Sequence, residues 1–214
     1  TRERQEISLD EWKYICDSLD MLPGPNKEAF RLLLYLLYYA DLTITEATSL
    51  EFNDLKNFAS KNEPPAIILP NRREKESRIY LIPEICEMLS LWLSTCPSTT
   101  TVTLGDRGKY FQMYAKLKTI AAQQARKSEE YKIANELETS APKNLRHAFA
   151  NHIVGMSCAD DAWILSAVTA SPKSYIFRYF PVRPNLSMTE YAERCQRISD
   201  FIRNKISDRH HEIG

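Results

Sequence analysis

The segment from residue 27 to residue 40 constrains the fold more than any other part of the chain, because it is strongly apolar and long enough for a helix. Overlapping it is an apolar run from Leu32 to Leu42 that only Asp41 interrupts. A strongly apolar helix belongs in the core of a protein. A membrane-spanning helix needs about 18 or more apolar residues, so this shorter run indicates a core helix. We therefore predict a central helix over about 27–40, capped by Asn26.

Further helices and one hairpin are predicted around this central helix. Alternating apolar residues predict antiparallel strands at 66–69 and 78–82, joined by a polar, mostly charged connection. Five glycines among 214 residues argue against a dinucleotide fold or a glycine-rich β architecture. The prediction is a single domain over 1–214, mainly α with a small antiparallel β-sheet (an α+β fold). Helical spacing, caps and prolines predict the other helices, at about 8–19, 45–50, 83–94, 107–123, 127–138, 142–154, 160–167, 171–180 and 188–206.

Three of these helix starts are predicted from particular residues. Ser8 and Glu11 have the spacing of a capping box, in which each side chain bonds the backbone N–H of the other. Thr45 is the predicted cap of the short helix that follows the central one. Pro83 suits the first position of its helix, because that position needs no backbone N–H donor.

The composition limits the function classes. The chain has 28 basic and 28 acidic residues, and duplex DNA selects for clustered Lys and Arg, so DNA binding requires that the cations gather locally. The five cysteines are widely spaced without a C-x-x-C pair, which indicates free thiols in a reducing cytosol rather than a zinc site. No secretory signal or membrane span is predicted, and we expect a cytoplasmic protein without a membrane partner. The chain begins at Thr1 without Met, and we expect it to be part of a longer chain.

The segment Lys143-Asn-Leu-Arg-His-Ala-Phe-Ala150 is the first candidate site. Its apolar residues have the spacing of a helix's buried face, and Lys143 and Arg146, three residues apart, share another face of the predicted helix. Two cations that face the same way can clamp a phosphate. Taken alone, the pair fits an ordinary solvated helix face better than a binding site.

This segment resembles the second conserved box of the tyrosine recombinase (phage integrase) family, His/Lys-x-x-Arg followed by His-x-Phe-Ala. An earlier segment, Asp41-Leu-Thr-Ile-Thr-Glu46 with Leu50-Glu-Phe-Asn-Asp54 after it, is similar to the family's Gly-Leu-Arg-Ile-Ser-Glu and Leu-x-Trp-x-Asp. Arg78-Ile-Tyr-Leu-Ile-Pro83 is similar to the Arg-x-Val-Pro-Leu-Pro segment that follows the family's β-hairpin. The likeness lies in the order of the boxes along nearly the whole chain.

The fourth box of the family is Gly-His-Ser-Ser, with a tyrosine nine residues after its histidine. Tyr179 lies nine residues after Ala170, which occupies the histidine position, and Tyr175 is a nearby rival for the role of nucleophile. Alone, Tyr179 would be assigned to a core helix. Ala170 and Thr43 are the degenerate positions, because Thr43 stands where the family has its first catalytic arginine. Losing one preorganised donor costs ~3 kcal/mol, or roughly 10² to 10³ in rate.

The resemblance implies the fold of a recombinase catalytic domain, without the DNA-binding domain that usually precedes it. It implies transesterification, in which a tyrosine oxygen attacks a DNA phosphodiester and forms a 3′-phosphotyrosyl bond, with no metal or other cofactor. Tyr179 would be the nucleophile, Arg146 a phosphate clamp, and Lys143 a proton or phosphate contact. Lys75, the only lysine at the hairpin tip, would protonate the leaving oxygen. The implied DNA-binding residues are Arg72, Arg73, Arg78 and His147.

The sequence leaves three functions open. The first is a site-specific recombinase or integrase acting on double-stranded DNA. The second is a DNA-binding or regulatory module of the same fold that does not cut, which Thr43 and Ala170 favour. The third is a helical interaction protein without a nucleic-acid role, which the balanced charge favours. Self-association on DNA is expected through the helix 188–206, whose apolar stripe must be covered by its own domain or by a neighbour.

Overall fold

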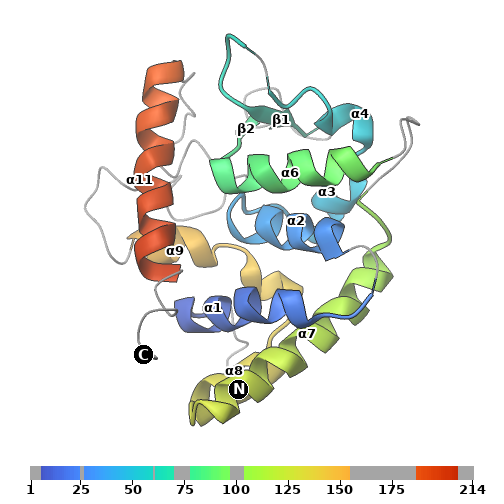
Figure 1. Ribbon diagram of the computed structural model, residues 1–214, viewed down its shortest axis with the longest axis vertical. Coiled ribbons are helices and arrows are strands. Elements are labelled where there is room, and N and C mark those ends of the chain that lie inside the picture. The colour runs from blue at the N-terminus through green and yellow to red at the C-terminus, as the bar shows by residue number, and fades with distance from the viewer. Residues whose placement is uncertain are drawn as a thin grey trace.

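The apolar segment forms helix α2 (Lys27–Tyr38), which lies between α1 (Leu9–Ser18) and α6 (Pro83–Thr95) (Figure 1). The computed structural model describes residues 6–24, 27–59, 61–69, 78–96, 104–154 and 187–206. Eight of the twelve residues of α2 are buried, so the prediction of a core helix is confirmed. Its predicted cap, Asn26, lies outside the described residues.

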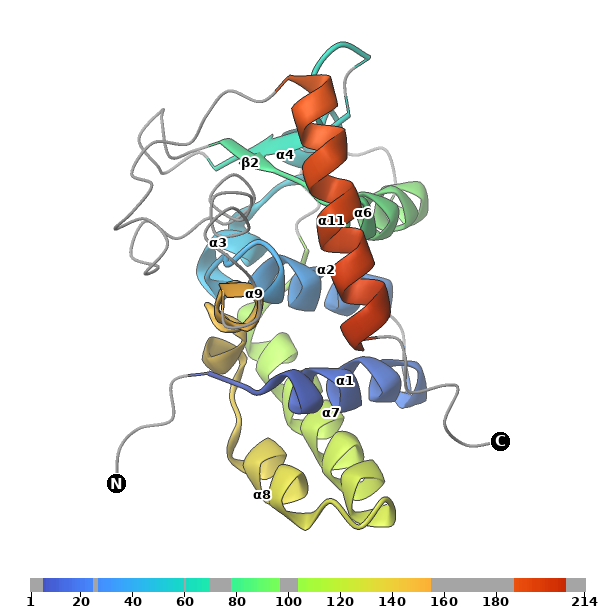
Figure 2. The same cartoon turned by 90° about the vertical axis from the view of Figure 1, so that its left-hand side faces the viewer.

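The other helices surround this centre. The short helices α3 (Ile44–Ser49) and α4 (Phe52–Leu55) follow α2, and the long helix α7 (Arg107–Lys127) packs lengthwise on α8 (Tyr131–Thr139) at one end of the molecule. Figure 2 shows this α7–α8 pair below α1 and α2, with α11 (Met188–Ile206) crossing the side of the domain. The remaining described helices are the 3₁₀ turns η1 (Leu19–Met21) and η2 (Pro142–Leu145) and the helix α9 (Ala148–Val154).

A two-stranded antiparallel sheet lies at the opposite end of the domain from α8 (Figure 1). Strand β1 (Ala66–Ile68) pairs with β2 (Arg78–Tyr80), with Ile67 opposite Ile79. Both of these isoleucines are buried, which fixes the register, because a slip of one residue would turn them toward solvent. The described structure is thus mostly helical with one small antiparallel sheet, as predicted.

Local signals set several helix starts correctly. The Ser8 hydroxyl accepts from the Glu11 N–H at 3.2 Å, and the Glu11 carboxylate accepts from the Ser8 N–H at 2.7 Å, so the predicted capping box is present. Pro83 occupies the first turn of α6, as predicted. The cap predicted at Thr45 is wrong. Thr43 caps α3 instead, in a capping box with Glu46.

The helix predicted over 142–154 is also wrong as a single element. The structure has the 3₁₀ turn η2, then extended backbone at Arg146 (ψ 148°), then His147 with a φ of 62°, and only then α9. Lys143 and Arg146 therefore do not share a face of one α-helix. The helices predicted over 160–167 and 171–180, and the hairpin tip, lie outside the described residues.

The apolar stripe of α11 packs on its own domain. Tyr191, Cys195, Ile198 and Ile202 are buried, and α11 contacts α1 and α6. The Tyr191 hydroxyl donates a hydrogen bond to the carbonyl oxygen of Leu81, which connects α11 to the chain between β2 and α6. The stripe therefore needs no second protomer to cover it.

Candidate functional site

Arg146 and the segment that begins at Asp41 meet in space although 105 residues separate them. The Arg146 Nε lies 3.4 Å from the Asp41 carbonyl oxygen and 3.7 Å from the Asp41 Oδ1. The neighbouring His147 donates its backbone N–H to Oδ1 at 2.9 Å, and its Nδ1 lies 3.1 Å from Oδ2. Two of the four segments singled out in the sequence are therefore joined by one carboxylate.

The backbone on both sides of this junction has an uncommon conformation. Asp41 has a φ of 60° and His147 a φ of 62°, in the left-handed region that L-residues other than Asn, Asp and His rarely enter. The turn before Arg146 is closed by Asn144, whose side-chain oxygen accepts from the Ala141 N–H at 2.8 Å. The Asn144 carbonyl in turn accepts from the Ile7 N–H at 2.9 Å. Arg146 thus leaves a turn that is held from several sides.

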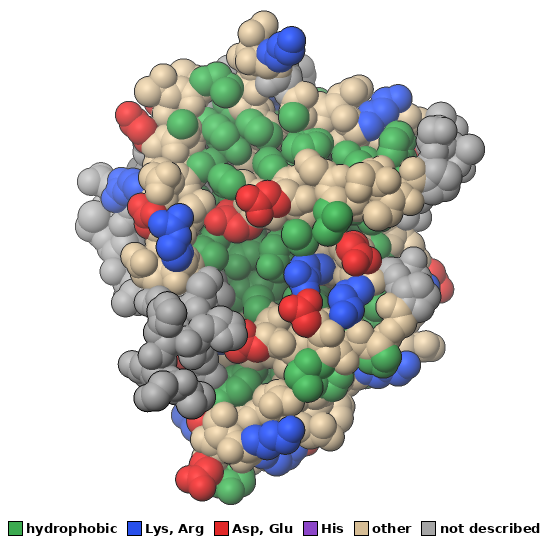
Figure 3. Space-filling view, viewed as in Figure 1, with side chains coloured by type: hydrophobic (Ala, Val, Ile, Leu, Met, Phe, Trp, Pro, Cys, Tyr) green, Lys and Arg blue, Asp and Glu red, His purple; other side chains and the backbone are tan. Residues whose placement is uncertain are grey.

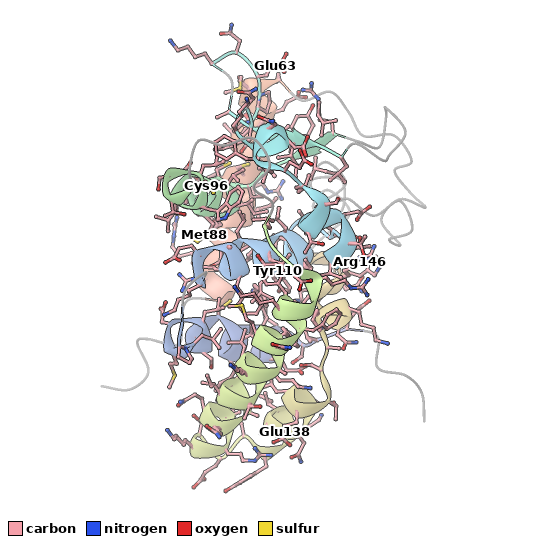
Figure 4. All side chains as sticks on the ribbon, turned by 90° about the vertical axis from the view of Figure 1, so that its right-hand side faces the viewer. Glu63, Met88, Cys96, Tyr110, Glu138 and Arg146 are labelled. Atoms are coloured by element: carbon pink, nitrogen blue, oxygen red, sulfur yellow. The ribbon has the colours of Figure 1, made fainter. Side chains whose placement is uncertain are left out.

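The Arg146 side chain is anchored through its Nε and is partly exposed. Its Asp41 contacts use Nε, and its side chain is 27% exposed, against 2% for Asp41. Within the described ranges, the two terminal nitrogens of Arg146 make no hydrogen bond. The planar guanidinium can therefore present two donors to one anion, the geometry that suits a phosphate or a carboxylate. Figure 4 shows Arg146 at one edge of the molecule, far from Glu138 near the end of α8.

The other predicted site residues are placed as follows. Lys143 is exposed on η2, three residues before Arg146. Arg78, the first residue of β2, forms a surface ion pair with Glu63 at 3.2 Å. The predicted site residues that lie outside the described ranges are Arg72, Arg73, Lys75, Ala170, Tyr175 and Tyr179.

Thr43 lies two residues after Asp41 but supplies no charge. Its hydroxyl accepts from the Glu46 N–H at 3.1 Å and donates to the Glu46 carboxylate at 3.0 Å. Both bonds belong to the cap of α3, so the hydroxyl is occupied in holding the start of this helix. Thr43, which the resemblance aligns with the first catalytic arginine of the tyrosine recombinases, therefore has a structural role.

A basic surface that the sequence reasoning missed lies on α7. This helix contains six basic and no acidic residues, although the whole chain is neutral. Lys118 donates to the carbonyl oxygens of Glu138 and Ser140, and Arg126 pairs with the Glu138 carboxylate at 2.8 Å. Lys109 and Lys116 are exposed. The sequence signal for this surface is the excess of Lys and Arg within α7, which the zero net charge of the whole chain conceals.

This basic helix borders the segment that carries Arg146. The Tyr114 hydroxyl on α7 lies 3.0 Å from the Ser140 hydroxyl, and Lys118 reaches the Ser140 carbonyl at 3.0 Å. Ser140 directly precedes the turn that leads to Lys143 and Arg146. By contrast, Figure 3 shows apolar side chains on the face over α6 and beside α11, and Lys and Arg do not gather among the side chains described there. Leu91 of α6 is exposed.

His152, the other described histidine, has a structural role. Its Nε2 donates to the Ile7 carbonyl at 3.1 Å, and its Nδ1 accepts from the Tyr38 hydroxyl at 2.8 Å. Burial lowers the pKa of His152, partly opposed by the bond to Ile7. The neutral imidazole thus links the start of the described chain to α2 and α9 rather than facing a ligand.

The described part of the chain offers neither a metal site nor a membrane span. Among the residues that the structure describes, no three His, Cys, Asp or Glu side chains are grouped so that they could hold a metal ion. In the same part of the chain, the helices are all too short or too polar to traverse a bilayer. Comparison of the chain with protein-family models, with curated proteins and with solved structures gave no match.

Proposed function

We propose that this protein binds double-stranded DNA and cleaves and rejoins its strands as a tyrosine recombinase does, through a 3′-phosphotyrosyl bond to Tyr179. The observation that carries the proposal is the guanidinium of Arg146, which Asp41 holds through Nε in a side chain that is 27% exposed. The resemblance links the segments around these two residues in one active site, and the two segments are in contact.

In the proposed reaction, the Tyr179 oxygen attacks the DNA phosphorus and the 5′-oxygen of the next nucleotide leaves. Arg146 stabilises the charge that develops on the nonbridging phosphate oxygens, because fixed donors in the site need little reorganisation. Lys143 contacts the phosphate or takes the tyrosine proton, and Lys75 protonates the leaving oxygen. The reverse attack by a 5′-hydroxyl on the phosphotyrosyl bond completes strand transfer, and no net bond energy is consumed.

Binding to the remaining DNA backbone is proposed for a wider set of cations. Lys109 and Lys116 of α7 are exposed, and they are assigned to phosphates other than the one that Arg146 binds. The ion pair of Arg78 with Glu63 is at the surface, so a phosphate can displace Glu63 at little cost. Arg72, Arg73 and His147 complete the proposed DNA contacts.

A second candidate is a DNA-binding module of the same type that does not cut. The observation that favours it is the capping box of Thr43, whose hydroxyl is occupied by Glu46 and carries no charge. A phosphate clamp with one arginine instead of two would bind DNA but lower the barrier to cleavage much less.

Two assays on the whole chain distinguish these candidates. Fluorescence anisotropy with a 40-base-pair duplex at several salt concentrations measures binding, which should weaken steeply as salt rises. Duplexes with randomised sequence and a nick that traps the cleaved strand test for a covalent adduct on a denaturing gel. An adduct that disappears in Tyr179→Phe supports strand transfer, and one that disappears only in Tyr175→Phe moves the nucleophile there. Salt-dependent binding without an adduct supports the second candidate, and absence of binding would refute both.

A further inference from the structure

We infer that Asp41 is the positioning residue of the site, which fixes the guanidinium of Arg146 and the imidazole of His147 for a phosphate. This inference rests on the proposed function. It assigns a role to a residue for which the sequence analysis predicted none.

The geometry around the Asp41 carboxylate carries the inference. The carboxylate is almost fully buried, and its two oxygens face three groups from two consecutive residues. They are the backbone N–H of His147 at 2.9 Å, the His147 Nδ1 at 3.1 Å, and the Arg146 Nε at 3.7 Å. A buried carboxylate is stable only where donors or cations compensate its lost hydration, so the three contacts hold each other in place.

The contacts also determine which atoms remain for a ligand. An ionised carboxylate only accepts hydrogen bonds, so the His147 Nδ1 that faces it carries the proton and Nε2 is the nitrogen that remains. In Arg146 the Nε is engaged and the two terminal nitrogens remain. Both residues are anchored at the side-chain nitrogen nearest the chain, which leaves two nitrogens of Arg146 and one of His147 for a ligand. Such anchoring reduces the conformational entropy that a phosphate contact would otherwise cost.

Asp41→Asn is the decisive variant, because it removes the charge and little else. Asn tolerates the left-handed φ of residue 41 as well as Asp does, and its side-chain oxygen can still accept from the His147 N–H. On a DNA-binding protein, the loss of a negative charge alone should strengthen binding. A positioning role predicts the opposite, a weakening of about tenfold, the order expected for one lost charge-assisted hydrogen bond.

Glu138→Gln is the matched control. Glu138 also pairs with an arginine, Arg126, at 2.8 Å, and its replacement changes the net charge by the same amount. We expect Glu138→Gln to leave DNA affinity unchanged or to raise it slightly. A weakening equal to that of Asp41→Asn would refute the specific role of Asp41.

The tautomer of His147 tests the inference without DNA. Long-range ¹H–¹⁵N NMR spectra, assigned with a His147→Gln variant among the four histidines, should show the Nδ1–H form in the wild-type chain. Asp41→Asn should shift this population toward Nε2–H. An Nε2–H ring in the wild-type chain would refute the positioning geometry even if Asp41→Asn did not fold. If the wild-type chain showed the Nδ1–H ring but did not bind the duplex, the proposed function would be wrong, and with it the role toward phosphate.

Discussion

Replacing Ile198 by Ala tests whether α11 belongs to its own domain, as the structure has it, or docks on a neighbouring protomer. Ile198 is 2% exposed and lies between Cys195 and Ile202 in the buried stripe of α11. The substitution removes three buried carbons and leaves a cavity, which costs about 2–4 kcal/mol at sites of this kind. That is a large part of the about 5–15 kcal/mol by which a typical domain is stable. For a chain of this size the Tm should fall by roughly 4–16 °C.

The assay is urea and thermal unfolding of wild-type and Ile198→Ala protein over a fiftyfold range of protein concentration. If α11 packs on its own domain, both midpoints are independent of concentration and the variant is less stable throughout. Glu193→Ala, an exposed position on the same helix, is the control and should change stability by less than about 0.5 kcal/mol. A wild-type midpoint that rises with concentration, together with a dimer that the variant loses in sedimentation, would show that α11 docks on a neighbour.

Three other perturbations have defined outcomes. Burial lowers the pKa of His152, so its imidazole takes up a proton at higher pH in the unfolded chain than in the folded one, and stability should fall as pH drops below about 6.5. Urea unfolding between pH 5 and 8 should show that stability depends less on pH in His152→Gln than in the wild-type chain. Thr43→Ala should lower the free energy of unfolding by about 1 kcal/mol through loss of the α3 cap, whereas Thr43→Ser should retain most of it in the same assay. The double variant Lys109→Ala/Lys116→Ala should weaken duplex binding regardless of sequence and reduce the salt slope by about two, and an unchanged slope would exclude α7 from the interface.

The parts of the fold that the sequence predicts well depend on contacts within a few residues. The capping box of Ser8 and Glu11, the proline that starts α6 and the apolar periodicity of α11 all lie where they were predicted. The start of α3 was placed at the wrong threonine. Thr43 and Glu46 have the three-residue spacing of a capping box, a local signal that distinguishes Thr43 from Thr45.

The turn at Arg146 and His147 could not be predicted in this way. The apolar spacing of this segment is helical, and helical spacing alone continues through residue 147. What ends the helix is the carboxylate of Asp41, more than 100 residues away, which accepts the His147 N–H that a continuous helix would use internally. Periodicity within a window cannot detect such a competitor, because tertiary contacts override local preference. The prediction that Lys143 and Arg146 share one face of an α-helix was therefore wrong, although the two cations do lie in one short segment of the chain.

The balanced charge of the chain is compatible with DNA binding once the cations are sorted by what they contact. Lys118 and Arg126 are bound to the α8 end of the molecule, so they stabilise the α7–α8 pair. Lys109 and Lys116 are exposed and seven residues apart on α7, which places them on one helix face roughly 10 Å apart. The local charge of such an exposed face, rather than the net charge of the chain, is what a DNA strand would meet.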